Sequence, residues 1–309
     1  MWIPRLCEEE LRQLVRTRPA VVITGARQTG KTSLVRRLFP DHGYISLDLP
    51  SEAEQAEHEP VRFLERHPSP LIVDEVQYAP GLLRHLKRAI DARRATAGQY
   101  VLTGSQPFAV MAGVTESLAG RAAVLTLGGL AFAEVHPVHP ALTVEDFLLR
   151  GGFPELYEKP ELEPRRFFSS YVATYLERDL RALLDVGSLR DFERFLRAAA
   201  LRTAGLLNRA ELARDVGVAA STGGAWLSVL ERSGLVTLLE PWFSNRSKSL
   251  IKTPKLHLAD TGLCAFLMGI GSRSDLLGSP LAGAMWESLV ANELQRLVAV
   301  AATPWQLAF

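Results

Sequence analysis

The chain has 309 residues, of which 47% are hydrophobic and 22% are charged, and its formal net charge at pH 7 is +1. The length allows two or three globular domains, and the near-zero charge excludes a global basic field for nucleic acid. Its two cysteines, Cys7 and Cys264, lie far apart, which favours a reducing compartment over a disulfide framework. Because residues 1–5 do not open a signal peptide and no apolar run could span a bilayer, we predict a cytoplasmic protein.

Up to about residue 135, short apolar strands alternate with helical stretches. This alternation predicts an α/β fold with a parallel sheet flanked by helices, whose ligands bind at the carboxyl ends of the strands. The predicted strands are 20–24, 44–48, 71–74, 100–104 and 123–127. The predicted helices are 8–16, 32–39, 60–66, 81–93 and 108–118.

A phosphate-binding P-loop follows the first predicted strand, because residues 25–32 have the spacing G-x-x-x-x-G-K-T before a helix. The glycines let successive N–H groups point at the phosphates, Lys31 adds a positive charge, and Thr32 offers a hydroxyl to Mg²⁺. A glycine-rich turn with a stray lysine is the alternative interpretation. The predicted nucleotide-binding residues are Gly25, Ala26, Arg27, Gln28, Thr29, Gly30, Lys31, Thr32 and Ser33.

Two adjacent acids, Asp74 and Glu75, end the apolar strand that begins at Leu71. Asp74 suits the Mg²⁺ contact of a Walker B aspartate. Glu75 lies where a general base would orient and deprotonate an attacking water, so the acid pair favours hydrolysis. A solvated charge at the strand end is the alternative for Glu75.

Two further polar candidates follow along the chain. Ser105 or Gln106, after the fourth strand, is a candidate sensor of the γ-phosphate, although Ser105 equally suits the cap of the next helix. Arg121, before the fifth strand, is a candidate catalytic finger that acts within its own chain or across a subunit interface. An ordinary exposed arginine is the alternative.

From about 141 to 200 the pattern is helical, over 145–150, 165–185 and 190–203, with Gly151-Gly152 as a helix end and turn. Next, helices over 209–216 and 221–233 are joined by a turn at Gly217, and strands over 235–240 and 255–258 follow. This order predicts a winged helix. The last helix is predicted over 281–297, and residues 302–309 begin like a strand.

DNA binding by this winged helix is open. Its second helix carries few residues that read bases, so contact with DNA would come from the cations of the wing. Those cations are Arg246, Lys248 and Lys252. Contact with a protein, or packing onto the ATPase, is the equal alternative.

Taken together, several stretches resemble the bacterial and archaeal AAA-type ATPases of group fourteen, whose second half is a domain of unknown function. The similarity runs almost end to end. Its carriers are GARQTGKTSL (25–34), YISLD (44–48), LIVDEVQ (71–77), LTGSQ (102–106), LAGR (118–121), RGGFPE (150–155), YVATYLERDL (171–180), 245–263 and WESLVANEL (286–294).

The resemblance implies a RecA-like ATPase core, a winged helix and a C-terminal region similar to restriction-endonuclease-like nucleases. By position, the resemblance implies that Gly30, Lys31 and Thr32 would bind phosphate and Mg²⁺. Asp74 would then bind the metal, and Glu75 would act on the water. Arg121 would be the arginine of the AGR motif. Relatives continue past Phe309 with a further acidic pair, so we expect the nuclease-like region to be incomplete. Glu287 and Glu293 alone offer too few oxygen ligands, and no nuclease activity is expected.

We therefore predict an ATPase domain (1–137), a helical linker or lid (138–203), a winged-helix module (204–262) and a partial nuclease-like region (263–309). The predicted function is ATP hydrolysis with Mg²⁺, coupled to the winged-helix half. The alternative is a nucleotide-gated DNA-binding regulator with slow or incidental hydrolysis. A small-molecule kinase is a third reading, against which the acid pair argues, and GTP is disfavoured because no Asn/Thr-Lys-x-Asp guanine reader follows. DNA, a homo-oligomer and a protein partner stay open as partners besides ATP.

Overall fold

The computed structural model describes residues 2–105, 110, 113, 114, 116–175, 189–242, 253–301 and 305–309. By its internal contacts the chain divides into an N-terminal unit, Pro4–Gly128, and a C-terminal unit, Gly129–Phe309 together with residues 1–3. The sequence placed the end of the ATPase domain later, at 137. The structure divides the chain earlier because Leu130 and Val135 belong to the hydrophobic core of the C-terminal unit.

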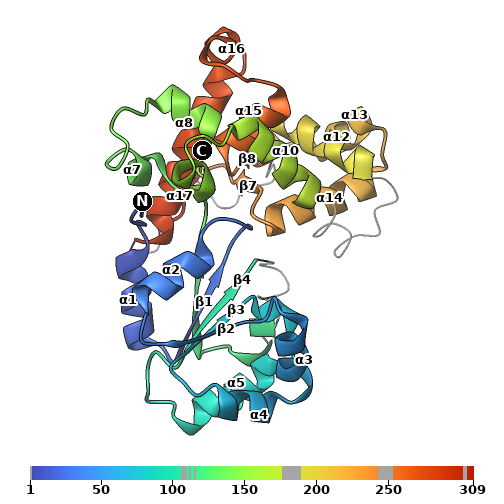
Figure 1. The fold of residues 1–309 in the computed structure, drawn as a ribbon. Helices are drawn as coiled ribbons and strands as arrows, with labels where there is room; N and C mark the ends of the chain where they lie inside the picture. The colour runs from blue at the N-terminus through green and yellow to red at the C-terminus, as the bar shows by residue number, and fades with distance from the viewer. Residues whose placement is uncertain are drawn as a thin grey trace. The chain divides into compact units, whose positions relative to one another are not determined.

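The N-terminal unit is a five-stranded parallel sheet in the order β2-β3-β4-β1-β5 (Figure 1), which confirms the predicted α/β fold. The strands are β1 (Ala20–Thr24), β2 (Gly43–Ser46), β3 (Leu71–Asp74), β4 (Tyr100–Gly104) and β5 (Ala122–Thr126). The helices are α1 (Glu8–Thr17), α2 (Lys31–Leu38), α3 (Pro50–His58), α4 (Pro60–Arg66), the 3-10 helix η1 (Val76–Tyr78) and α5 (Leu82–Ala92). Of the helix predicted over 108–118, residues 108, 109, 111, 112 and 115 lie outside the described residues.

Helices cover both faces of this sheet, with α1 and α2 on one side and α3, α4 and α5 on the other (Figure 1). The central strands are therefore continuous apolar runs, as expected of strands buried on both faces. Along β1 every residue is buried, and Val22 packs in one cluster with Phe63 of α4 and Leu86 of α5. The register aligns the strand ends, since Thr24 pairs with Gly104. The loops that follow these strands therefore meet at one edge.

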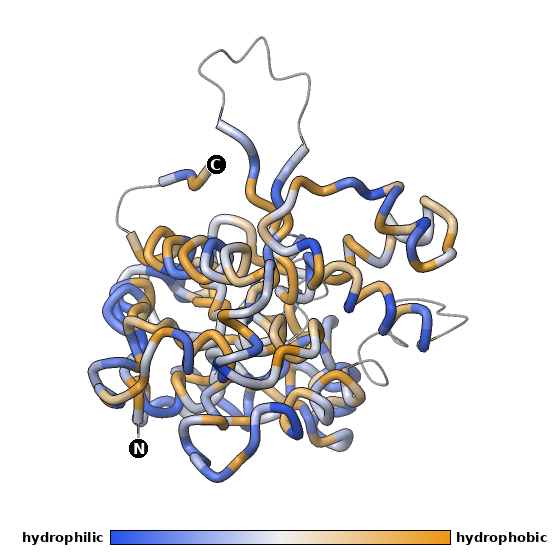
Figure 2. The backbone as a smooth tube through the Cα atoms, turned by 90° about the horizontal axis from the view of Figure 1, so that it is seen from above, coloured by the Kyte–Doolittle hydropathy of each residue, from blue (hydrophilic) through white to orange (hydrophobic). Residues whose placement is uncertain are grey.

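The C-terminal unit is mostly helical and holds one antiparallel sheet in the order β6-β8-β7. Its first helices are α7 (Phe132–Val135), α8 (Val144–Arg150), α9 (Pro154–Glu158), α10 (Pro164–Tyr175), α12 (Leu189–Ala200), α13 (Arg209–Val216) and α14 (Ala220–Arg232). Its strands are β6 (Gly205–Leu206), β7 (Val236–Leu239) and β8 (Lys255–Leu258), and its last helices are α15 (Thr261–Met268), α16 (Arg273–Gly278) and α17 (Ala282–Ala299). Figure 2 shows hydrophobic and hydrophilic residues interspersed along the tube, and the amphipathic helix α12 buries Phe192, Phe195, Leu196, Ala199 and Ala200.

The region in which the sequence predicts a winged helix contains α13 and α14, joined by a turn at Gly217, and then the hairpin of β7 and β8. Gly217 has a φ of 79°, the left-handed conformation that ends many helices. The predicted wing cations lie in 243–252, outside the described residues.

Near the end of the chain, 305–309 contain no strand. Instead Phe309 pairs through its backbone with the residues that follow β7 (Figure 2). Its N–H donates to the carbonyl of Glu240 (3.2 Å), and its carbonyl accepts from the N–H of Trp242 (2.8 Å).

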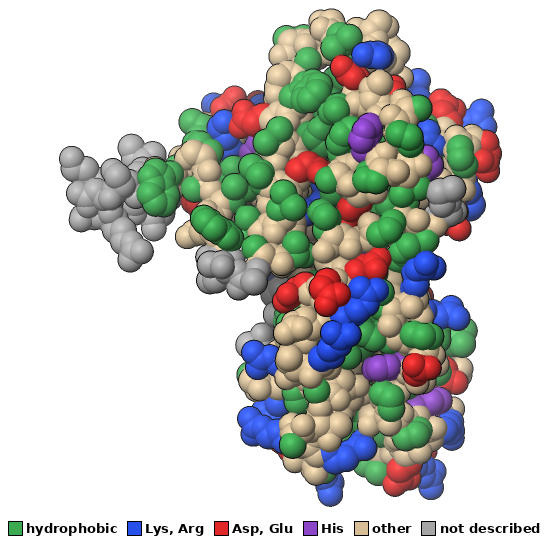
Figure 3. All heavy atoms as spheres, turned by 90° about the vertical axis from the view of Figure 1, so that its left-hand side faces the viewer, with side chains coloured by type: hydrophobic (Ala, Val, Ile, Leu, Met, Phe, Trp, Pro, Cys, Tyr) green, Lys and Arg blue, Asp and Glu red, His purple; other side chains and the backbone are tan. Residues whose placement is uncertain are grey.

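One face of α17 exposes large apolar side chains at helical spacing. They are Trp286 (37% exposed), Val290 (52%), Leu294 (42%) and Leu297 (47%). Figure 3 shows hydrophobic side chains gathered on the surface of the C-terminal unit. Within the described ranges, no helix is both long and apolar enough to cross a bilayer.

Candidate nucleotide site

The P-loop connects β1 to α2 through three left-handed backbone positions, Gly25 (φ 141°), Gln28 (φ 60°) and Gly30 (φ 89°). Gly25 has no room for a side chain, because a Cβ there would lie 2.1 Å from the carbonyl oxygen of Leu127. Lys31 begins α2, and its Nζ donates to the carbonyls of Gly25 (3.0 Å) and Ala26 (2.8 Å). The ammonium group thus folds back onto the loop, where an incoming phosphate would compete for it.

Arg5 braces this loop from the N-terminal side. Arg5 is 7% exposed, and its guanidinium donates to the carbonyls of Thr29 (2.9 Å) and Gly128 (2.7 Å). The hydroxyl of Thr29 donates to the carbonyl of Ala26 (3.0 Å) and closes the loop on itself. The Arg27 side chain turns towards the hydroxyl of Tyr78 (3.4 Å).

Asp74 is buried and accepts hydrogen bonds from three side chains. The hydroxyl of Thr32 donates to both of its carboxylate oxygens (2.9 and 3.0 Å), Tyr44 donates to Oδ2 (3.1 Å), and Thr103 donates to Oδ1. The Thr32 hydroxyl and the Asp74 carboxylate, brought together here, are hard oxygen ligands of the kind that Mg²⁺ takes. The donor set therefore fits the magnesium ion that the sequence predicts.

Glu75 lies next to this group in an uncommon backbone conformation, with φ 58° and ψ 47°. Its Oε2 accepts from the N–H (3.0 Å) and the hydroxyl (2.8 Å) of Ser105, and from the side-chain amide of Gln77. Burial alone would raise the pKa of Glu75, but these hydrogen bonds and the charge of Lys31 together bring it below its ordinary value. Glu75 is therefore ionised at neutral pH, as a general base must be.

Ser105 therefore lies in the same polar cluster as Glu75. Its side chain faces the carboxylate and is 5% exposed. Gln106, the other sensor candidate, lies outside the described residues, and Ser33 at the start of α2 is exposed.

Arg121 cannot reach this site within its own chain, which corrects one of the two roles predicted for it. It precedes β5, and Ala122 pairs with Ala20 at the amino end of β1, whereas the P-loop follows the carboxyl end. Five residues at about 3.3 Å each place it roughly 16 Å away along the strand. There it forms a two-bonded ion pair with Asp91 of α5 (2.7 and 2.9 Å). A role across a subunit interface stays a prediction.

The two glutamates of α17 make structural contacts in the C-terminal unit. Glu287 forms an ion pair with Lys255 (2.5 Å). Glu293 accepts from the N–H groups of Phe132 (2.9 Å) and Ala133 (3.3 Å) at the start of α7. Across the described part of the chain, no three His, Cys, Asp or Glu side chains gather as a metal site would require.

Three residues of the nucleotide site escape sequence reasoning, namely Arg5, Tyr44 and Gln77, whereas the turn that begins at Thr103 is expected at this edge of the sheet. Tyr44 and Thr103 meet Asp74 only because β2 and β4 lie on either side of β3. Which strands pair is a long-range property of the fold that the local pattern of one strand does not encode. For Gln77 the sequence does offer a signal that could have identified it, because it follows the acid pair within three residues.

Comparison with known proteins gives two family matches and two similar proteins. Residues 17–136 match the family model of an AAA domain, and residues 142–274 match that of a domain of unknown function, DUF8612. Uncharacterized proteins of Mycobacterium bovis and Mycobacterium tuberculosis are each 31% identical over 291 residues, which cover 94% of this chain. The chain spans 65% of the length of these relatives.

A solved structure shares the fold. The Walker-type ATPase PABY2304 of Pyrococcus abyssi superposes with a TM-score of 0.56 at 17% identity, over 86% of this chain and 96% of that one. The resemblance to AAA-type ATPases of group fourteen is confirmed by the family match. Residues 17–136 thus match the AAA domain family and have the fold of a P-loop ATPase, and residues 142–274 match DUF8612.

Proposed function

We propose that this chain binds ATP with Mg²⁺ and hydrolyses it, and that the nucleotide state is passed to its C-terminal unit. The convergence of Lys31, Thr32, Asp74 and Glu75 at the carboxyl edge of one parallel sheet carries the proposal. This edge is where ligands of such sheets bind. The AAA-domain family and the fold of a Walker-type ATPase support it.

The chemistry is an in-line attack of water on the γ-phosphorus. Lys31 leaves the loop carbonyls to bind the phosphate oxygens, and the backbone N–H groups of the P-loop bind the same anion. Thr32 and Asp74 would hold Mg²⁺, which offsets negative charge on the phosphates when it is bound. Glu75 accepts a hydrogen bond from the attacking water and takes its proton.

Coupling would run through the short segment that leaves the ATPase sheet. Leu127 packs on Gly25 of the P-loop, and its N–H donates to the carbonyl of Thr24 (2.7 Å). Three residues later, the N–H of Leu130 donates to the carbonyl of Gly152 (2.5 Å). A shift of the P-loop would therefore move a segment that is hydrogen-bonded within the C-terminal unit a few residues further along the chain.

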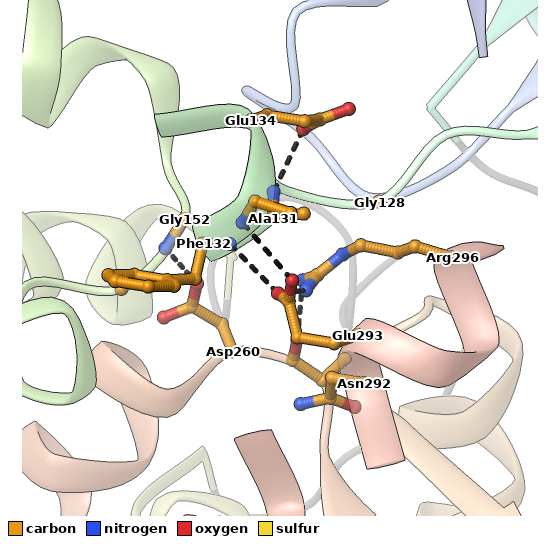
Figure 4. A network of polar contacts seen from close by, with 12 residues as sticks. Gly128, Ala131, Phe132, Glu134, Gly152, Asp260, Asn292, Glu293 and Arg296 are labelled. Carbon is orange, nitrogen blue, oxygen red and sulfur yellow. Dashed lines mark hydrogen bonds and ion pairs between the residues drawn. The ribbon is translucent and has the colours of Figure 1, made fainter. Parts of the chain in front are cut away.

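The anchor itself is a polar network inside the C-terminal unit (Figure 4). Glu293 of α17 points at the start of α7 and binds Phe132 there, while Arg296 holds the Glu293 carboxylate (3.1 Å). Asp260, the N-cap of α15, accepts from the N–H of Gly152 (2.7 Å). The stretches 150–155, 259–263 and 286–294, which carry much of the family resemblance, thus meet where the segment enters.

Hydrolysis is tested with the purified chain, by measuring Mg²⁺-dependent phosphate release and bound nucleotide in parallel. We expect Lys31→Ala to lose nucleotide binding, and Glu75→Gln to keep binding while turnover falls by about 10² to 10⁴-fold. Glu54→Gln, at an exposed position of α3, is the matched control and should behave like the parent. Normal turnover in Glu75→Gln would remove Glu75 from the role of base.

Coupling is tested by hydrogen exchange in the C-terminal unit with and without ATP. We expect ATP to change the exchange of peptides from α7 and α15 in the parent. Glu293→Ala removes the hydrogen bond to the N–H of Phe132. It should abolish that change in exchange while ATP affinity stays the same. If the response is identical in Glu293→Ala, this network is not the route.

A DNA-binding regulator is the second candidate, and the helices and hairpin described above favour it. The exposed side of α14 offers small side chains, such as Ser221 and Ala225, which make no bidentate contacts with bases. Binding would therefore rest on Arg246, Lys248 and Lys252, with a strong salt dependence and little sequence choice. Reversal of these three to glutamate should weaken DNA binding and flatten its salt dependence, and unchanged affinity would exclude this candidate.

A further inference from the structure

Gln77 is held in a definite orientation beside the proposed base. Its side-chain Nε2 donates to Oε2 of Glu75 and lies 3.3 Å from the hydroxyl oxygen of Ser105. With the N–H and hydroxyl of Ser105, three groups donate to this one carboxylate oxygen. Across the described chain, the other oxygen, Oε1, accepts no hydrogen bond.

The orientation of the rest of the Gln77 amide is unfavourable in free energy. Its own carbonyl oxygen is buried and has no hydrogen-bond partner. It packs against β4, where a Cβ on Gly104 would lie 2.8 Å from it. A buried carbonyl without a partner is unfavourable. A glutamine that only filled space would not need to leave its acceptor unpaired while its donor faces a carboxylate.

The backbone supports the same orientation. The left-handed conformation of Glu75 turns its side chain towards the end of β4, and its N–H donates to the hydroxyl of Thr103 (3.2 Å). The three donors then fix the rotation of the carboxylate. Gln77 follows within the one-turn helix η1, so its position relative to Glu75 is set locally.

We propose that Gln77 is a positioning residue for Glu75, which clamps Oε2 against Ser105 and so leaves Oε1 for the attacking water. The inference rests on the proposed function for its catalytic consequence. The clamp itself is a property of the nucleotide-free protein. General bases lose much of their effect when they are misplaced by about 1 Å.

The test compares three variants. Gln77→Met keeps the length of the side chain and removes the donor, Gln77→Glu places a like charge beside Glu75, and Gln13→Met is the control on the exposed side of α1. We expect kcat to fall by about 10- to 100-fold in Gln77→Met and further in Gln77→Glu. ATP affinity and KM should stay within about twofold of the parent, because no phosphate contact is lost.

A second measurement needs no nucleotide. The amide of Ser105 donates to Glu75, so its hydrogen exchange should become faster in both Gln77 variants and stay unchanged in Gln13→Met. Parent-like exchange in Gln77→Met would overturn the clamp, and parent-like kcat would overturn its catalytic role. If the parent itself shows no turnover, the proposed function fails, and the exchange measurement still decides on the clamp.

Discussion

Asp260→Ala should destabilise the C-terminal unit, because one carboxylate serves two segments that are far apart in the sequence. Its Oδ1 accepts from the N–H of Leu263 (2.8 Å) as the cap of α15, and its Oδ2 accepts from the N–H of Gly152 (2.7 Å). Both bonds are buried. Gly151 is shaped to this contact, because a Cβ on it would lie 2.3 Å from Oδ1.

The size of the effect follows from the two donors. Each buried N–H group that loses its partner costs about 1–3 kcal/mol, so the pair costs about 2–6 kcal/mol. Burial raises the pKa of Asp260, which means that desolvation of its charge offsets part of the gain. We therefore expect a loss of about 2–3 kcal/mol. The free energy of unfolding of Asp260→Asn should lie between those of the parent and of Asp260→Ala. Asparagine caps helices as well as aspartate does, but it turns an NH₂ group towards the N–H of Gly152.

Urea unfolding followed by tryptophan fluorescence measures this loss selectively. All five tryptophans belong to the C-terminal unit, namely Trp2, Trp226, Trp242, Trp286 and Trp305. With an m-value of about 2–3 kcal/mol/M, the midpoint should fall by about 1 M in Asp260→Ala. A midpoint equal to that of the parent, or one lower in Asn than in Ala, would refute the assignment of the two bonds.

Three further outcomes are expected. Gly25→Ala should abolish ATP binding, measured by equilibrium dialysis, because its Cβ would clash with Leu127 at a φ of 141°. Tyr44→Phe should raise the Mg²⁺ concentration needed for half-maximal ATP binding by about three- to tenfold, since Asp74 loses one donor, while binding in EDTA stays unchanged. Burial raises the pKa of Cys264 to about 12, so its contribution to stability is complete below the free-thiol pKa of about 8.5 and is lost as the pH rises towards 12. At pH 8, a thiol reagent should accordingly titrate no cysteine in the native protein and two after unfolding in urea.

The site was predictable where the chemistry lies within one strand and its loop. The P-loop spacing and the acid pair predict Lys31, Thr32, Asp74 and Glu75 as members of the candidate site, and the structure places them at one edge of the sheet. The position of Arg121 was also within reach of the sequence, because a residue before a parallel strand lies at the amino edge, opposite the ligand. The partners Tyr44 and Arg5 depend on strand order and on a long-range approach, which no local pattern encodes.

The fold was predictable where periodicity was strong. Strands β1, β3, β4 and β8 and helices α4 and α13 have the predicted bounds. Helix α3 was missed because it buries only Ala56 and so shows almost no apolar period. Helix α15 was missed for the opposite reason, since six of its eight residues are buried and no face stands out. The missing signal in both helices is a contrast between two faces.

Because both native thiols are buried, the movement that coupling requires can be measured with dyes attached to introduced cysteines. Cys7 and Cys264 are each at most 6% exposed, so a maleimide dye should label introduced cysteines selectively. Exposed positions are available in each unit, at Glu54 and Ser221. A donor and acceptor dye pair at these positions would report the distance between the two units by energy transfer as ATP binds and turns over. The natural sequence thus allows a direct measurement of inter-unit movement without prior removal of its own cysteines.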